Sequence, residues 1–126
     1  MIVEAGSELV SELWDAPMEA AASILFYPEG RAALAAARRG GRLSSSTHGR
    51  ACEEFESLQS ELLLVGIDEL LAREAGELAE GHGLRGYDAV HLASALALGA
   101  GTAVVSWDED LRRAAVQSGC PVAPPG

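Results

Sequence analysis

Short apolar runs alternate along this chain with segments of helical composition, and this alternation limits the fold more than any other feature. The runs 62–67 and 102–106 are apolar rather than half polar, which is typical of strands covered on both faces. Each run is followed by an Asp that can cap a helix, Asp68 in the first case and Asp108 in the second. Strands that alternate with helices form parallel sheets. We therefore predict an α/β fold, a parallel β-sheet flanked by helices on both faces.

Capping residues and helix breakers locate the other elements. A helix with an apolar stripe is expected over 8–15 and ends at Pro17. An Ala-rich helix is expected to end near Arg39, at the pair Gly40-Gly41. The remaining expected elements are strands at 19–24 and 121–122, helices over 69–80, 87–98 and 109–118, and a helix that opens at 44–47. Together they fit a single domain over residues 1–126.

Composition limits the classes of function. With 126 residues, 48% hydrophobic and 22% charged, the chain is typical of a globular domain. Its apolar runs are too short to cross a bilayer, and its start has no basic stretch followed by an apolar region. We therefore expect a cytoplasmic protein without membrane contact, in which Cys52 and Cys120 are reduced thiols. The sequence also has no Gly-x-Ser-x-Gly elbow and no Walker-type phosphate loop.

Charge is unevenly distributed. The net charge of −10 argues against a polyanionic partner, yet all nine basic residues are arginines and the segment 30–50 contains no acid. Arginine suits phosphate recognition because its planar guanidinium can bind two oxygens at once. The segment is thus a candidate RNA-binding surface, and a solvated helix face explains it equally well. Its candidate contacts are Arg31, Arg38, Arg39 and Arg42.

Three acids lie where the ligand of such a fold would bind. Asp108 directly follows the run 102–106, and open parallel sheets bind ligands beyond the carboxyl ends of their strands. Asp88 lies at the start of a helix of small residues, and Glu29 starts the Ala-rich helix. Converging carboxylates repel one another unless a cation neutralises them, and oxygen ligands without His or Cys favour Mg²⁺ or Mn²⁺ over Zn²⁺. We therefore predict a divalent metal site formed by these three acids.

Each of these acids also has a structural explanation. Asp88 and Asp108 are good helix N-caps, and Glu29 is also explained as a surface acid of a helix. Ser106 is expected either to hold a metal-bound water or simply to end its strand, and Arg85 is a candidate supporting residue.

The segments around the acids resemble the PIN-domain family, and within it the VapC-type toxins of bacterial toxin–antitoxin pairs. Residues 84–96, with the string Asp-Ala-Val-His-Leu-Ala, are similar to the most recognisable segment of the family. Residues 27–34 resemble its first acidic helix, and residues 104–111 resemble its late strand with a metal-site Asp. The middle motif is specific, and the other two are persuasive in its company. The resemblance covers nearly the whole chain.

The resemblance implies a PIN-like α/β/α sandwich and an endoribonuclease that depends on Mg²⁺ or Mn²⁺ and acts on RNA, often tRNA or ribosomal RNA. It also implies a homodimer that a cognate VapB-like antitoxin neutralises. Carried over residue by residue, the metal-site and catalytic acids are Glu29, Asp88 and Asp108.

One departure from the family concerns the first strand. The family opens with a strand that ends in a metal-ligand Asp, whereas residues 1–9 resemble the segment that follows it. We therefore expect a PIN-like domain that lacks the usual first strand and leaves a central position of the sheet vacant. A start codon further upstream, a shortened chain and a true absence of the strand are open explanations. The alternative function is a degenerate, inactive PIN domain that binds protein or RNA.

Overall fold

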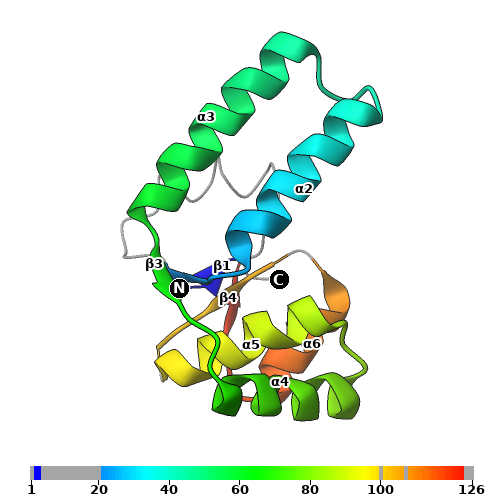
Figure 1. Ribbon diagram of the computed structural model, residues 1–126. Coiled ribbons are helices and arrows are strands. Elements are labelled where there is room, and N and C mark those ends of the chain that lie inside the picture. The colour runs from blue at the N-terminus through cyan, green and yellow to red at the C-terminus, as the bar shows by residue number, and fades with distance from the viewer. Residues whose placement is uncertain (1, 4–20, 100, 107, 124–126) are drawn as a thin grey trace.

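The computed structural model describes residues 2–3, 21–99, 101–106 and 108–123. Its strands form a parallel sheet with the order β3-β2-β1-β4-β5, and helices pack against this sheet (Figure 1). The strands are β1 Ile2–Val3, β2 Ala21–Ser23, β3 Leu63–Val65, β4 Val104–Val105 and β5 Val122–Ala123. The helices are α2 Phe26–Arg39, α3 Ser45–Glu61, α4 Glu69–His82, α5 Gly86–Leu98 and α6 Glu109–Gln117. None of these helices has the length and apolar character that crossing a membrane requires.

Helices cover both faces of the sheet. Successive residues of a strand point to opposite faces, and β4 shows this directly. Val104 packs in a cluster with Leu92 and Leu111, from the helices α5 and α6. Val105 packs with Phe26 and Phe55, from the helices α2 and α3. Figure 1 shows α2 and α3 rising together on one side, with α4, α5 and α6 gathered on the other. The predicted α/β/α sandwich is confirmed.

The centre of the sheet is occupied by β1. Ile2 pairs with Ala21 of β2 and with Val104 of β4, and Val3 pairs with Val105. The expectation of a vacant central position is therefore wrong. A parallel ladder needs only a short extended segment, and the β-branched residues Ile and Val favour that conformation. The helix predicted over 8–15 lies outside the described residues.

The strand β3 lies at an edge of the sheet, and this corrects the prediction for the run 62–67. Leu63 and Leu64 are 51% and 40% exposed, so this strand is not covered on both faces. A continuous apolar run predicts burial but carries no information on which strand lies at the edge. Val104 and Val105, in contrast, are buried as predicted.

Local side-chain signals set several helix boundaries as predicted. The Ser44 hydroxyl accepts a hydrogen bond from Thr47 N at 3.2 Å and caps α3. Asp68 Oδ1 accepts from Leu71 N at 2.8 Å and caps α4. The helix α4 continues past its predicted end at residue 80 to His82, and Gly83 ends it with a φ of 67°, a left-handed conformation that glycine adopts without strain.

The helices α2 and α3 are joined by aromatic packing. The ring of Phe55 lies 5.3 Å from that of Phe26 and 5.8 Å from that of Tyr27, measured between centroids. Gly30 faces Phe55 so closely that a Cβ atom at this position would overlap the ring. At the surface, the Tyr27 hydroxyl donates to Glu56 Oε1 at 2.6 Å. These contacts hold α2 and α3 together as a helical hairpin, which carries Glu29.

Candidate metal centre

Asp88 is a buried carboxylate in the first turn of α5. The residue is 2% exposed, because the small side chains of α5, such as Ala89 and Ala93, let the helix pack closely in the core. Its Oδ2 atom accepts a hydrogen bond from Arg85 Nε at 3.0 Å. Its Oδ1 atom is buried and has no hydrogen-bond partner among the described residues. A buried carboxylate oxygen without a partner is unfavourable unless a cation or water satisfies it.

Asp108 follows β4 and caps α6. Its Oδ1 atom accepts from Leu111 N at 2.9 Å, as the N-cap explanation predicts. Its Oδ2 atom is turned to Arg85, whose Nη2 atom lies 3.9 Å away. The side chain is 34% exposed, and one oxygen stabilises the helix while the other faces Arg85. Capping and a site role are therefore compatible in this residue.

The two acids converge on the same guanidinium. Arg85 Nη2 lies 3.0 Å from Asp88 Oδ2 and 3.9 Å from Asp108 Oδ2, so these oxygens are no further apart than the two distances combined. The Arg85 side chain is 77% exposed and reaches the acids from solvent. The position beyond the carboxyl end of β4 is where a parallel sheet binds its ligands.

This pair of carboxylates fits a divalent cation. Mg²⁺ is commonly held by one or two carboxylates, with water and substrate phosphates completing its shell. The buried Oδ1 atom of Asp88 supplies an oxygen to which no described residue donates a hydrogen bond, and Asp108 supplies a second carboxylate near the same guanidinium. Within the described ranges, no group of three or more His, Cys, Asp or Glu side chains is arranged to hold a metal ion.

Glu29 is the predicted acid that the structure does not bring into contact with the other two. It is exposed in the first turn of α2, and its side chain forms no hydrogen bond or ion pair with any residue that the structure describes. The next residue, Gly30, faces Phe55. Packing of α2 on α3 therefore decides where Glu29 points, and its place in a metal site stays a prediction.

Three side chains order the turns that follow the strands β4 and β2: Ser106, which was predicted, and Arg112 and Ser23, which the sequence did not single out. Ser106 Oγ accepts a hydrogen bond from Asp108 N at 3.0 Å and so orders the turn after β4. Arg112 Nη1 donates to the Ser106 carbonyl at 2.8 Å. Ser23 ends β2 in the same way, with Oγ accepting from Leu25 N at 3.0 Å. A serine at a strand end, followed closely by a helix, is the signal that could have identified Ser23.

The predicted RNA-binding arginines differ in their surroundings. Arg31 Nη1 lies 3.0 Å from Glu56 Oε1 and donates to the Tyr27 hydroxyl at 2.8 Å. The hydrogen bond that Arg31 donates to Tyr27, and then the hydrogen bond to Glu56 and the charge of Glu56, raise the pKa of Arg31, so it remains cationic while it links α2 to α3. The other candidates are exposed near the tip of the hairpin: Arg38, Arg39 and Arg42.

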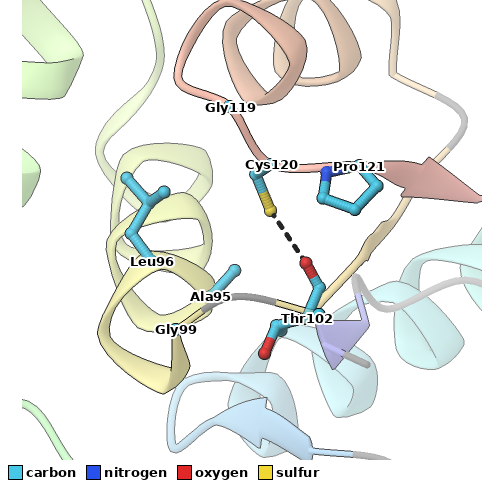
Figure 2. A pocket seen from close by; sticks show the side chains of 8 residues that line it. Ala95, Leu96, Gly99, Thr102, Gly119, Cys120 and Pro121 are labelled. Atoms are coloured by element: carbon cyan, nitrogen blue, oxygen red, sulfur yellow. Dashed lines mark hydrogen bonds between the residues drawn. The ribbon is translucent and has the colours of Figure 1, made fainter.

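A pocket lies near the amino ends of β4 and β5, and Figure 2 shows the side chains that line it. Its lining includes Thr102 and Pro121, which precede β4 and β5, whereas Asp108 follows β4. The Cys120 thiol lines it and donates to the Thr102 carbonyl at 3.3 Å. Burial raises the pKa of this thiol. The pocket is therefore separate from the candidate metal centre.

Comparison with known proteins agrees with the fold and the resemblance. Residues 4–117 match the model of the family described as "PIN domain". Ribonuclease VapC45 of Mycobacterium tuberculosis strain CDC 1551 / Oshkosh is 46% identical over 125 residues, which are 98% of this chain and 87% of that protein. Ribonuclease VapC49 of strain ATCC 25618 / H37Rv has the same identity and coverage.

Two solved structures share the fold. The crystal structure of PAE2754 from Pyrobaculum aerophilum matches with a TM-score of 0.72 and 23% identity, covering 90% of this chain and 84% of that one. The structure of VapBC2 from Rickettsia felis, bound to a DNA fragment from their promoter, matches with a TM-score of 0.61 and 16% identity, covering 97% of both chains. At these identities the likeness shows the fold alone.

Proposed function

Because the chain belongs to the PIN domain family, and within it to the VapC type, we propose that it is a metal-dependent endoribonuclease and the toxin of a VapBC-type pair. The observation that carries this proposal is the convergence of Asp88 and Asp108 on one cationic group, together with a buried Asp88 oxygen that no described residue partners. An acid pair of this kind at the carboxyl edge of a parallel sheet suits metal-assisted hydrolysis of a phosphodiester.

Asp88 and Asp108 are the residues that would hold Mg²⁺ or Mn²⁺, and Glu29 is the proposed third acid. When bound, the ion supplies an activated water and neutralises charge on the phosphodiester. Burial of Asp88 in α5 limits the orientations of its carboxylate. Ser106 holds the backbone N–H of Asp108, and through it the start of α6. The chain thus contributes acids whose positions are set before substrate binds, which favours catalysis.

The proposed RNA contacts lie on the hairpin. Arg38, Arg39 and Arg42 are exposed where no acid is near in sequence, and each can pair with a backbone phosphate. Arg31 belongs to the same surface, but its guanidinium is shared with Glu56 and Tyr27, so we assign it a smaller share of the binding free energy. A local basic surface of this kind is needed because the net charge of −10 repels RNA as a whole.

Partners follow from the VapC type of the chain. We propose a cognate VapB-like antitoxin that neutralises the nuclease, a homodimer, and action in the cytoplasm, where RNA is available. Exposed apolar side chains in the edge strand β3 and next to it, such as Leu63 and Ile24, are compatible with contact to a second chain.

The test of the function is cleavage of single-stranded RNA by the purified chain. We expect cleavage with Mg²⁺ or Mn²⁺, loss of cleavage in EDTA, and loss in Asp88→Asn. The amide has the size of the carboxylate but lacks its charge, so the fold should persist, which circular dichroism checks. Asp68→Asn is the matched control, because Asp68 caps α4 away from the acid pair and Asn caps a helix equally well. Cleavage that continues undiminished in EDTA or in Asp88→Asn would refute the mechanism.

A degenerate, inactive PIN domain that binds protein or RNA is the second candidate. The observation that favours it is that Glu29 contacts neither of the other acids among the described residues. Titration with Mn²⁺ separates the two candidates. An intact site raises the melting temperature as metal concentration rises. At a metal concentration of a hundred times the dissociation constant, binding adds about 2.7 kcal/mol to the free energy of unfolding. A vestigial site leaves the melting temperature unchanged.

A further inference from the structure

Arg85 stands between solvent and the acid pair. It is the N-cap residue of α5, but its side chain forms no capping hydrogen bond. Instead, Nε and Nη2 both lie 3.0 Å from Asp88 Oδ2, and Nη2 lies 3.9 Å from Asp108 Oδ2. The guanidinium therefore occupies the point where the two carboxylates converge.

The charge of Arg85 offsets the burial of Asp88. A carboxylate whose side chain is 3% exposed is unfavourable without a nearby cation, and Arg85 is the cation that the described chain places there. The match is incomplete, because both nitrogens address Oδ2, while the buried Oδ1 atom has no hydrogen-bond partner in the part of the chain that the structure describes. A small divalent cation that reaches both oxygens would satisfy Asp88 better than the guanidinium does.

We propose that Arg85 is a resident counter-ion that exchanges with the divalent metal and then binds the RNA phosphate. This inference rests on the proposed nuclease function. Two cations cannot share the same carboxylate oxygens at hydrogen-bond distance without strong repulsion, so Arg85 leaves the acids when metal binds. Its side chain is 77% exposed, so it can turn outward at little steric cost. There its planar guanidinium lies at the mouth of the site and can bind two oxygens of a phosphodiester.

The exchange makes metal and RNA cooperative ligands. Metal that binds to the acids must displace Arg85, which weakens its apparent affinity. RNA that engages Arg85 removes this competitor and strengthens metal binding, and by linkage metal strengthens RNA binding equally. The chain would thus keep its acids neutralised without substrate and bind metal tightly only in the presence of RNA.

The first test measures the Mn²⁺ dissociation constant by calorimetry in the full chain, without RNA. Arg85→Gln removes the competing charge, so we expect metal to bind about twofold to fivefold more tightly, the effect of losing one partly exposed ion pair. Arg85→Lys keeps the charge and should stay near the original affinity. Arg73→Gln is the control, because Arg73 makes a similar 2.9 Å ion pair with Glu69 on the surface of α4. An unchanged or weaker Mn²⁺ affinity in Arg85→Gln overturns the exchange.

The second test needs no substitution. In the NMR spectrum of the unmodified chain, the Arg85 Nε–Hε resonance should move toward the position of a free guanidinium as Mg²⁺ is added, while that of Arg73 stays in place. A resonance that stays fixed while Mg²⁺ binds overturns the exchange.

RNA cleavage, assayed in parallel, separates the two levels of the argument. Cleavage with metal but no response at Arg85 means that the nuclease function stands and the exchange fails. Absence of both metal binding and cleavage, in the original chain and in Arg85→Gln, overturns the nuclease proposal together with the exchange.

Discussion

Gly30→Ala offers a test of how α2 is held against α3. In most helices this change is favourable by about 0.5–1 kcal/mol, because alanine loses less conformational entropy than glycine. Here the new Cβ would overlap the ring of Phe55. A flexible neighbour would move aside, but Phe55 is 3% exposed and packed against Phe26 and Tyr27. The ring has little room to move.

The expected magnitude follows from two opposing effects. Insertion of one carbon into a well-packed core destabilises by about 1–3 kcal/mol, which exceeds the helical gain. We therefore expect Gly30→Ala to lower the free energy of unfolding by about 0.5–2 kcal/mol. For a domain of this length that is a fall in melting temperature of roughly 2–8 °C.

Gly76→Ala is the matched control. Gly76 lies inside α4, and a Cβ atom there would meet nothing within 4 Å, so only the helical gain remains. We expect a rise in melting temperature of roughly 2–4 °C. Thermal and urea unfolding, followed by circular dichroism, measure both variants. In the double variant Gly30→Ala/Phe55→Leu, the penalty of the first change should shrink, because the two residues are coupled. A Gly30→Ala protein as stable as Gly76→Ala would show that the hairpin is not packed through this contact.

Two further predictions concern the hairpin tip and the buried thiol. Arg38→Gln/Arg39→Gln should weaken binding of single-stranded RNA in EDTA buffer. The slope of the logarithm of the binding constant against the logarithm of salt concentration should fall by about 1.4, as expected for two lost phosphate contacts, whereas Arg73→Gln should leave it unchanged. Equal slopes in all three proteins, measured by fluorescence anisotropy, would contradict the RNA surface. Burial raises the pKa of Cys120 above the value of about 8.5 for an unfolded thiol, so its contribution to stability is intact below that pH and is lost as the pH rises through the folded pKa. Urea unfolding between about pH 8 and 10 should therefore show that the free energy of unfolding falls more steeply with pH in the original chain than in Cys120→Ala. Equal dependence on pH in the two proteins would contradict this reasoning. Cys52→Ala, at a partly exposed thiol, serves as the control.

Local signals in the sequence predicted most of the secondary structure. Ser44 and Asp68 cap the helices that they were expected to cap, and Gly83 ends α4 with a positive φ. These features are predictable because a cap or a left-handed glycine acts within a few residues of itself. The same holds for Asp108, whose N-cap role is visible in the sequence and confirmed at 2.9 Å.

Relations between distant segments were harder to predict. The run 62–67 contains the strand β3, but the place of this strand at the sheet edge leaves Leu63 half exposed, which apolar composition alone does not reveal. The segment Ile2–Val3 fills the centre of the sheet, although the resemblance of residues 1–9 to a later part of the family pattern led us to expect a vacant position there. In both cases the pairing partners, rather than the local residues, decide the outcome.

The sequence by itself determined the α/β class and the capping residues, and it singled out Asp88 and Asp108 as candidate site acids, because periodicity and local chemistry depend on neighbours along the chain. Only the tertiary structure decided that Arg85 joins these two acids and that Arg31 pairs with Glu56. Among the described residues it also leaves Glu29 exposed, without a hydrogen bond or ion pair. Such pairings depend on where a helix lies after its apolar side has packed, as the contact of Gly30 with Phe55 shows. A charge is placed by the packing beneath it, and packing is a property of the whole fold.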